Sequence, residues 1–583
     1  MNAQDPRLTR LDAVAAASEH ELKFALTDSM VAEFAERASA GLTRPALRLA
    51  NRYFDTPAGE LMNARVSLRV RRAGDRFVQT VKAAGEGPFE RFEWERPIAG
   101  EQPELDALPP SSHPAGALIR DGFGLLMPVF ETNFERELRL VQPQPGVRVE
   151  VACDRGEIRA GERSEPIAEV EFERKEGPAA AFYHYALQWA RLHDARLLLP
   201  SKNERGLRLA GWLTEPAPVK AVPVAPPASA PTCEAARAIL HGHLAAFLAN
   251  AEPVLAGTDA EGPHQLRVAL RRFRSAVRFF DLRRAAGDDG ARWQAVDAAA
   301  RTLAGAAGFV RDADVFENGL LAQLTHSFPG DAALQVLRRA LLQAREHERQ
   351  LLRDAIRAPA ATAFVLEALV AIESLAALPW PAPHFEAFAS ARLAALARRA
   401  RRRTARAAVE ADWHEVRIAI KNLRYALDGC RALDVTSLPV GDAISRLAEW
   451  QGRLGLGQDL AVARAVASRA LGYGAAPAGM GVRAAALIDG YRAFAARSAA
   501  PEKLRKPIRS FLDALLKDPP PPREPASGDG AGDDGERGNG ERGNGERGDG
   551  ERGDRGGPTG GAAGLSSDGA AGRVRGTQIG RRQ

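Results

Sequence analysis

The pattern of polar and apolar positions changes near residue 213 of this chain of 583 residues. Over residues 18–212, short segments alternate apolar with charged residues between turn signals, which predicts a strand-rich domain. Over residues 233–518, long segments rich in Ala, Leu and Arg have a helical period. Because the chain is too long for one hydrophobic core, we expect a β domain followed by an all-α domain.

Three further segments lack the periodicity of a packed core. Residues 1–17 are expected to form a loose leader, and residues 213–232 are rich in Pro and Ala, which is typical of a semi-extended linker. Residues 519–583 consist mainly of Gly, Pro, Asp, Glu and Arg, without the strict three-residue Gly period of collagen. We expect this last segment to be a disordered tail.

The first domain repeats one kind of charged strand. In Glu19-His20-Glu21-Leu22-Lys23, a strand would place Glu19, Glu21 and Lys23 on one face. One such strand is most often a solvated outer face. Similar alternation recurs in residues 67–71, 76–82, 91–95, 134–136, 149–151 and 168–173. So many strands could instead turn their charged sides inward around a barrel, with helices near residues 28–40 and 178–194 covering the apolar outer faces.

A lumen with interleaved acids and bases suits an anionic ligand that carries metal. Lysine and arginine bind phosphate oxygens, arginine through its bidentate fork and lysine as a point charge. Carboxylates are the ligands preferred by hard cations such as Mg²⁺ and Mn²⁺. The pattern therefore indicates a site for a metal-bound polyphosphate group.

These residues resemble the signature of the CYTH family, also called the triphosphate tunnel metalloenzymes. Glu19-x-Glu21-x-Lys23 is followed by seven supporting segments in the family's order, and the resemblance spans residues 18–212. It implies an eight-stranded antiparallel β tunnel with flanking helices that hydrolyses or rearranges triphosphates with a divalent metal. The supporting segments are 53–57, 68–71, 80–82, 91–95, Glu150 with Asp154, Glu169-x-Glu171, and 201–206.

The resemblance also implies roles for individual residues. One metal ion would neutralise the substrate and a second would activate the attacking water. The expected catalytic residues are Glu19, Glu21, Lys23, Lys82 and Glu171. The expected triphosphate-binding residues are Lys23, Arg69, Arg71, Lys82, Arg136, Lys202 and Arg205. The expected ligands of Mg²⁺ or Mn²⁺ are Glu19, Glu21, Glu169, Glu171 and Asp154, with Glu93 and Glu95 as weaker candidates.

The second domain contains an internal repeat. Residues 264–278, HQLRVALRRFRSAVR, align without gaps to residues 414–428, HEVRIAIKNLRYALD. In each copy the His and the basic positions share one helical face, while another face is apolar. A solvated Arg-rich face would explain one such helix, but repetition in register favours a functional basic face. A second repeated pair, in residues 308–315 and 455–462, carries Asp312 and Asp459, which could support the basic residues or cap helices.

The repeated His-x-x-Arg-x-x-x-Arg/Lys-x-x-Arg resembles the CHAD family of helical domains. The resemblance implies two pseudo-symmetric helical bundles with a basic groove that binds inorganic polyphosphate. The second copy is less basic, since Asn422 replaces Arg272 and Asp428 replaces Arg278. The expected polyphosphate-binding residues are His264, Arg267, Arg271, Arg274, His414, Arg417, Lys421 and Arg424.

Composition excludes few classes of protein. The net charge is +6, from 80 basic and 74 acidic residues. The 3 cysteines are far apart and provide neither a disulfide framework nor a zinc site. The N-terminus lacks an apolar signal core, and no stretch of about 18 apolar residues occurs. We expect a soluble bacterial protein of the cytoplasm, associated with polyphosphate granules and with no membrane partner.

The sequence thus predicts a hydrolase, an inorganic triphosphatase that converts tripolyphosphate to diphosphate and phosphate and carries a polyphosphate-binding module. Class IV adenylate cyclase or thiamine triphosphatase activity, or a non-catalytic polyphosphate-binding scaffold, remain alternatives. Nucleic acid is disfavoured because the basic helices lack regular aromatic residues for base stacking. The exact substrate, the metal, the oligomeric state, the role of the tail and any regulation of the tunnel by the helical domain stay open.

Overall fold

The structure is a computed structural model of the whole chain. It describes residues 17–39, 46–85, 87–257, 259–285, 287–433, 438–473, 479–499 and 501–516. The predicted tail and nearly all of the predicted leader lie outside these residues.

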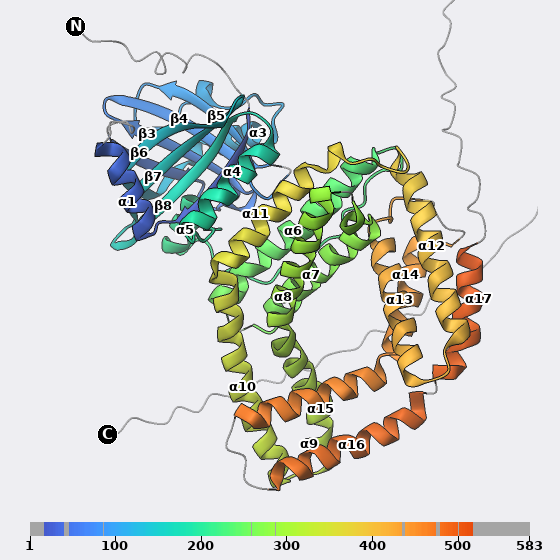
Figure 1. The fold of residues 1–583 in the computed structure, drawn as a ribbon. Helices are drawn as coiled ribbons and strands as arrows, with labels where there is room; N and C mark the ends of the chain where they lie inside the picture. Colours follow the sequence, from blue (N-terminus) through green and yellow to red (C-terminus); the bar gives the residue numbers. More distant parts are fainter. Residues whose placement is uncertain are drawn as a thin grey trace, which may run out of the picture. The chain divides into compact units, whose positions relative to one another are not determined.

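The first domain is a closed antiparallel barrel of eight strands, in the order β1-β5-β4-β3-β2-β6-β7-β8 (Figure 1). This confirms the predicted eight-stranded antiparallel barrel. The strands are β1 (Ala17–Ala25), β2 (Leu47–Asp55), β3 (Val66–Ala73), β4 (Arg76–Ala84), β5 (Glu90–Ile98), β6 (Met127–Gln144), β7 (Val147–Ala160) and β8 (Arg163–Glu176). The helices of this part are α1 (Asp28–Ser39), α2 (Glu60–Asn63), α3 (Pro114–Asp121), α4 (Ala179–Leu192) and α5 (Lys202–Leu209).

The apolar outer faces of β1, β7 and β8 are covered by α1 and α4. Leu22 and Phe172 on the strands are fully buried, as are Phe34 of α1 and Phe182 of α4, in one hydrophobic cluster. Because strand residues alternate between faces, burying Leu22 and Phe24 outside the barrel turns the charged residues of β1 inward. The predicted helices near residues 28–40 and 178–194 therefore determine which faces of these strands point into the barrel.

Part of the lumen is apolar. On the inner faces of β6, β7 and β8, Phe134, Ile158 and Ile167 form a buried cluster with Leu207 of α5. The short α5 packs closely against β6, since a Cβ atom on Gly206 would lie 2.1 Å from the ring of Phe130. A capping box at Ser201 begins this helix. The charged lumen expected from the sequence is thus bounded by an apolar layer and a helix.

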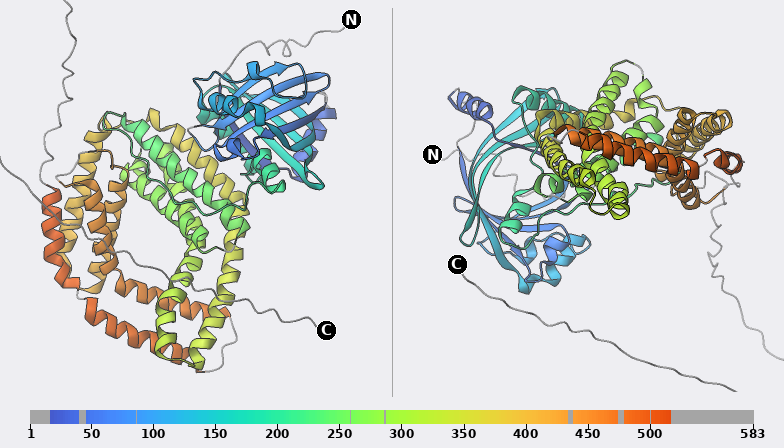
Figure 2. Two further views of the ribbon diagram at one scale, coloured as in Figure 1. Left: turned by 180° about the vertical axis from the view of Figure 1, so that it is seen from behind. Right: turned by 90° about the horizontal axis from the view of Figure 1, so that it is seen from below.

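The second domain is helical, and its second half repeats the order of contacts in the first (Figures 1 and 2). In the first half α6 packs on α7 and α7 on α8; in the second half α12 packs on α13 and α13 on α14. The helices are α6 (Thr232–Ala256), α7 (Glu261–Phe279), α8 (Gly287–Phe316), α9 (Ala322–Ser327), α10 (Ala332–Arg357), α11 (Pro359–Glu373), α12 (Phe385–Arg406), α13 (Glu410–Asp428), α14 (Val440–Arg453), α15 (Leu456–Tyr473), α16 (Met480–Ala499) and α17 (Arg505–Leu515).

Helix α11 also packs on α4 of the barrel domain. Arg191 Nη2 lies 2.7 Å from Glu367 Oε1, and the backbone N–H of Leu197 donates to Thr362 Oγ1 at 2.9 Å. The apolar residues of α4 and α11 belong to one continuous buried cluster. Together with its following turn, α11 forms a segment (Pro359–Ala377) with mean hydropathy 1.7, long and apolar enough to cross a membrane, although 61% of it is buried. This corrects the expectation that no such stretch exists, but burial of this kind is typical of a core helix.

Candidate active site and basic helical site

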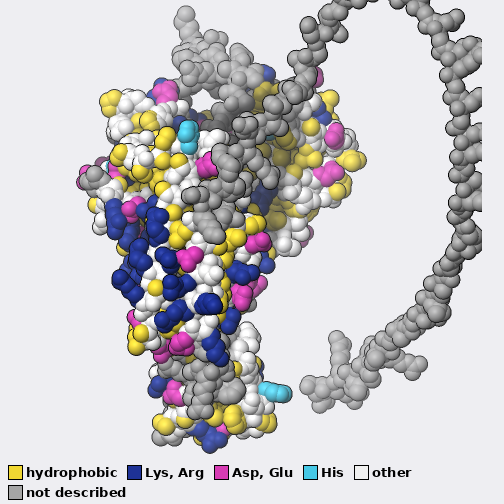
Figure 3. Space-filling view, turned by 90° about the vertical axis from the view of Figure 1, so that its right-hand side faces the viewer, with side chains coloured by type: hydrophobic (Ala, Val, Ile, Leu, Met, Phe, Trp, Pro, Cys, Tyr) yellow, Lys and Arg dark blue, Asp and Glu magenta, His cyan; other side chains and the backbone are white. Residues whose placement is uncertain are grey.

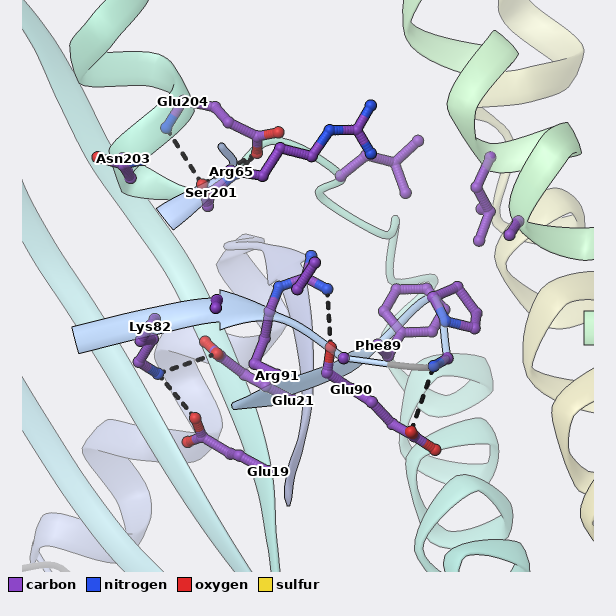
Figure 4. Close-up of a pocket in the computed structure, with 18 of the residues that line it drawn as sticks. Glu19, Glu21, Arg65, Lys82, Phe89, Glu90, Arg91, Ser201, Asn203 and Glu204 are labelled. Carbon is purple, nitrogen blue, oxygen red and sulfur yellow. Dashed lines mark hydrogen bonds and ion pairs between the residues drawn. The ribbon is translucent and has the colours of Figure 1, made fainter. Parts of the chain in front are cut away.

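The barrel lumen opens into a cavity of about 1330 Å³. Figure 4 shows part of its lining, with Glu19, Glu21 and Lys82 close together. The predicted site residues that line the cavity are Glu19, Glu21, Lys23, Arg69, Arg71, Lys82, Arg136, Glu171 and Lys202. Three others, Asp154, Glu169 and Arg205, are buried behind this wall and are not part of the cavity lining.

Lys82 of β4 lies at the centre of one carboxylate cluster. Its Nζ donates to Glu19 Oε2 at 2.7 Å and lies 3.1 Å from Glu93 Oε1 and 3.5 Å from Glu21 Oε2 (Figure 4). Strand register brings these residues together, because Lys82 pairs with Glu93 across β4 and β5. One ammonium group is therefore shared among three carboxylates.

The two glutamates of the first motif differ in their acidity. Burial raises the pKa of Glu19, and repulsion from Glu21 and Glu173 adds to the rise despite attraction by Lys82. Burial would also raise the pKa of Glu21, but Lys23, 3.0 Å away, and Lys82 lower it to about 2. Glu21 is thus firmly ionised, while Glu19 is the carboxylate that an added cation would stabilise most.

A second group lies on β3 and β5. Arg69 Nη2 is 3.7 Å from Glu95 Oε1, and Arg71 Nη1 is 3.9 Å from the same oxygen. Burial would raise the pKa of Glu95, but the two arginines lower it to about 2. Burial raises the pKa of neighbouring Glu93 to about 7, with a contribution from repulsion by Glu19 and Glu95. The lumen therefore contains both strongly and weakly acidic carboxyl groups.

The third group surrounds Lys202, the first residue of α5. Its Nζ donates to Asp154 Oδ2 at 2.7 Å, to Glu171 Oε1 at 2.9 Å and to Glu169. Burial would lower the pKa of Lys202, but these three carboxylates raise it. Arg136 donates to both carboxylate oxygens of Asp154 at 2.7 Å each. Arg205 Nη1 donates to Glu169 Oε2 at 3.0 Å, so this predicted phosphate ligand is engaged inside the wall.

The carboxylates fit a hard divalent cation. Oxygens of Asp154, Glu169 and Glu171 lie within 4.8 Å of one another, and in this structure the Lys202 ammonium lies among them. Glu171 also lines the cavity with Glu19 and Glu21, and a bound cation would relieve the repulsion from Glu21 that helps to raise the pKa of Glu19. Oxygen donors of this kind are preferred by Mg²⁺ and Mn²⁺.

The sequence reasoning did not consider the cavity residues Arg65 and Lys175. Lys175 extends the inner face of β8 beyond Glu171 and Glu173, and lies 3.9 Å from Glu150 of β7. Continuing the two-residue period of β8 would have predicted Lys175. Glu150, Glu173 and Arg91, which belong to the charged segments noted in the sequence, also line the cavity.

The structure brings the two copies of the basic repeat into contact, because α7 packs on α13. Arg267 Nη1 donates to Asp312 Oδ1 at 2.8 Å. Of the two roles expected for Asp312, supporting a basic residue or capping a helix, this contact fits the first. Arg274 Nε donates to Asp297 Oδ1 at 2.9 Å, and Arg424 Nε donates to Gln451 Oε1 at 3.1 Å. The side chain of Asp459 lies outside the described residues.

The centre of this basic site is short of negative charge. Burial, together with repulsion from Arg271 and Arg417, lowers the pKa of Lys421 to about 8. Burial also lowers the pKa of Arg271, with repulsion from Arg267 and Arg424, and its Nε atom is buried without a hydrogen-bond partner. Crowded cations of this kind indicate a site that an anion would stabilise.

The two repeated histidines are half-buried on the same helices. Burial lowers the pKa of His264, and repulsion from Arg311 contributes. His414 has the equivalent position on α13. All eight predicted polyphosphate-binding residues thus lie on α7 and α13.

A separate group of basic residues covers the outer face of α12. Figure 3 shows Lys and Arg side chains gathered on the side of the molecule where α12 and α17 lie. Because the apolar residues of α12 face inward, its arginines are left together on the opposite, outer face. The exposed arginines of α12 are Arg398, Arg399, Arg401, Arg402 and Arg406.

Comparison with known families agrees with this architecture. A CYTH domain model matches residues 17–207, and a CHAD domain model matches residues 238–468. The chain therefore has a CYTH domain followed by a CHAD domain.

Individual relatives cover parts of the chain. An inorganic triphosphatase of Haemophilus influenzae is 30% identical over 196 residues, which are 33% of this chain and 54% of that protein. The chain thus spans about half the length of this curated relative. The CHAD domain of the plant Ricinus communis is 27% identical, with a TM-score of 0.44, over 52% of this chain and 99% of that one. A Hippeastrum protein described as an adenylyl cyclase with dominant triphosphatase activity is 16% identical, with a TM-score of 0.25, over 34% of this chain and 98% of that one.

Proposed function

We propose that this protein is a divalent-metal-dependent inorganic triphosphatase that hydrolyses tripolyphosphate to diphosphate and phosphate. The observation that supports this most is the lumen, where lysines and arginines from β1, β3, β4, β6 and α5 surround one cavity together with carboxylates. Such a site can neutralise a substrate with several negative charges while retaining oxygen ligands for metal. The match to a CYTH domain and the similarity to a triphosphatase support the same reaction class.

The cations of the cavity bind and orient the phosphate groups. Lys82 and Lys23 would exchange their carboxylate partners for phosphate oxygens, and Arg69 and Arg71 would bind from the neighbouring strand. Arg136 lines the cavity, and its Nε and Nη2 donate to Asp154 in a bidentate pair that holds the guanidinium group in place. Catalysis by these residues is mainly positioning and stabilisation of charge on the transferred phosphoryl group.

Glu19, Glu21 and Glu171 would hold the divalent cation on the cavity side, with Glu169 and Asp154 behind them. A bound Mg²⁺ or Mn²⁺ supplies charge neutralisation at the phosphates and lowers the pKa of bound water. Lys202 keeps the buried carboxylates neutralised, and its displacement from Glu171 would free that carboxylate as a ligand.

A substrate panel tests this function. Phosphate release from tripolyphosphate, ATP and thiamine triphosphate is measured with Mg²⁺, with Mn²⁺ and with EDTA. We expect tripolyphosphate to be hydrolysed fastest, only with metal, and expect Glu19→Gln and Lys23→Met to abolish release. Glu135→Gln is the matched control, because Glu135 is an exposed residue that pairs with Arg48 on the outer face. Turnover like that of the wild type in both lumen variants contradicts the assignment.

Organic triphosphates form a second candidate substrate class. Beyond the charged residues the cavity is lined by apolar side chains, among them Phe89, Leu198, Leu199 and Leu213, which could contact a ring system. Faster turnover of ATP to a cyclic product, or of thiamine triphosphate, would move the protein to an adenylate cyclase or thiamine triphosphatase activity. Binding of all three without turnover would favour a non-catalytic scaffold.

We further propose that the helical domain binds inorganic polyphosphate and takes the protein to cytoplasmic polyphosphate granules. The crowded cations around Lys421 and Arg271 support this, because a flexible polyanion can supply the missing negative charge. Competition of long-chain polyphosphate against duplex DNA at physiological salt tests the ligand. A fluorescent fusion of the chain tests the location, with dispersal in cells that lack polyphosphate as the expected result.

A further inference from the structure

Two arginines at one end of the tunnel are not used by the proposed triphosphate site. Val66 pairs with Ala83 across β3 and β4, and Ala84 pairs with Arg91 across β4 and β5. Arg65 directly precedes Val66, so Arg65 and Arg91 lie at the same level of the barrel with only the methyl group of Ala84 between them. Two strand spacings, about 10 Å, separate their backbones.

Both side chains belong to the cavity. Arg91 is in phase with the inward residues Glu93 and Glu95 of β5, and both Arg65 and Arg91 line the cavity (Figure 4). The next level inward contains Lys82, which pairs with Glu93. A two-residue step along a strand is about 7 Å, so the two arginines extend the row of cations outward from Lys82.

These arginines differ from the inner cations in their partners. Lys23, Lys82, Arg69, Arg136 and Lys202 each contact at least one carboxylate. Among the described residues, neither Arg65 nor Arg91 has a carboxylate within 4.0 Å. Arg91 Nη1 donates to the backbone carbonyl of Glu90 at 2.9 Å, and Arg65 is exposed. Their charges are therefore available to a ligand.

The backbone of Arg65 is strained. Its φ is 56°, in the left-handed region that favours glycine, and its N–H donates to Met62 O at 3.0 Å at the end of α2. Among the described residues, the Arg65 side chain has no ion-pair partner that would account for an arginine here. A non-glycine residue in this conformation at a cavity is a reason to look for function.

We infer that Arg65 and Arg91 form an outer anion subsite, which binds the part of a linear condensed phosphate that extends beyond the third phosphate. This inference rests on the proposed function and adds a determinant of chain length to it. The cavity has room for such an extension, since its 1330 Å³ continues past this level to the residues of the linker. The subsite makes a longer inorganic chain, rather than tripolyphosphate alone, a ligand of the tunnel.

Binding of tripolyphosphate, tetrapolyphosphate and ATP tests the subsite. Titration calorimetry is done in EDTA on the full chain carrying Arg271→Ala and Lys421→Ala, so that the helical domain does not contribute. We expect Arg65→Ala with Arg91→Ala to weaken tetrapolyphosphate binding at least 10-fold and tripolyphosphate binding less than 3-fold. Arg72→Ala is the matched control, because Arg72 is exposed on β3 and its Nε donates a hydrogen bond to the backbone carbonyl of Gly74.

Two further measurements keep the result interpretable. Arg65→Gly should lose tetrapolyphosphate affinity without melting below the wild type, which separates ligand binding from folding. Hydrolysis of both phosphates is followed in parallel, so an inactive wild type would reject the proposed activity while the binding data still decide the subsite. An equal loss for both phosphates, no loss, or a loss confined to ATP would overturn the inference.

Discussion

The tunnel and the helical site both contain clusters of cations, but they differ in how far carboxylates neutralise them. At the helical site Arg267 and Arg274 pair with Asp312 and Asp297, whereas the central Arg271 and Lys421 have no carboxylate within 4.0 Å among the described residues. Lys82 is shared by three carboxylates and Lys202 by three more, whereas Lys421 is surrounded by Arg271, Arg417 and other cations. The pKa of Lys82 and Lys202 is raised by this environment, and that of Lys421 is lowered to about 8.

This difference predicts two modes of phosphate binding. In the proposed triphosphatase, carboxylates of the tunnel would keep the cations charged and ordered before the ligand binds and would also supply ligands for a metal. At the proposed polyphosphate site, repulsion among the central cations would be relieved by a bound polyanion. We therefore expect substitutions at one site to leave the other site unaffected.

The largest effect is expected in the tunnel. Lys82→Met removes the shared cation of Glu19, Glu21 and Glu93, and should lower kcat for tripolyphosphate by about 10²–10³-fold, the scale for loss of one preorganised charge donor. Steady-state phosphate release measures this. Lys220→Met, at an exposed position of the linker, is the control and should be neutral. Polyphosphate binding by the helical domain should not change; a parallel loss there would show that Lys82→Met unfolds the chain.

A smaller effect is expected for the basic helices. Arg271→Ala with Lys421→Ala should weaken binding of long-chain polyphosphate by about 10–100-fold, since each of the two lost hydrogen-bonded contacts contributes a net free energy of about 0.5–1.5 kcal/mol. The slope of log affinity against log salt should also become shallower by roughly 2, about 1 for each cation removed. Fluorescence anisotropy at several salt concentrations measures both quantities. Arg284→Ala, at a side chain 83% exposed beyond α7, is the control.

Hydrolysis of tripolyphosphate by the same double variant is the complementary measurement. It should remain at the wild-type rate, because neither residue lines the tunnel cavity. Loss of hydrolysis together with polyphosphate binding would mean that the helical site contributes to the reaction.

A pH titration sharpens the comparison further. The pKa of Lys421 is about 8 in the free protein, below the usual 10.5, so the side chain is charged at pH 7 and largely neutral at pH 9. Polyphosphate binding favours the charged form, so affinity should fall as pH rises from 7 to 9, by up to about 10-fold for one charged contact. Lys421→Arg stays protonated and should flatten the profile. An unchanged slope in that variant would exclude Lys421 as the titrating group.

Strand periodicity and the internal repeat predicted which charged side chains would share a face in each domain. The two-residue period placed Glu19, Glu21 and Lys23 on one inward face, because burying Leu22 and Phe24 leaves them no alternative. The repeat likewise paired Arg271 with Lys421 before α7 and α13 were known to touch. These inferences needed only local geometry.

Other features depend on long-range packing that no local period encodes. Lys202 lies among Asp154, Glu169 and Glu171 because α5 packs on three strands far earlier in the chain. The apolar layer of Phe134 and Ile158 depends on the same helix. For this reason the sequence predicted the expected metal ligands and Arg205 together in one lumen, whereas the structure divides them between the cavity wall and the interior behind it.

The smallest expected effect concerns stability at the edge of the tunnel. Arg65→Gly should stabilise the chain by up to about 1 kcal/mol, because glycine adopts the left-handed backbone at φ 56° without the steric cost of a Cβ, partly offset by its greater freedom when unfolded. Urea unfolding followed by tryptophan fluorescence measures this, with Arg91→Gly, in the regular strand β5, as a control that should destabilise. A destabilised Arg65→Gly variant would show that the arginine is retained for folding, and the strained position would then give no support to a ligand-binding role.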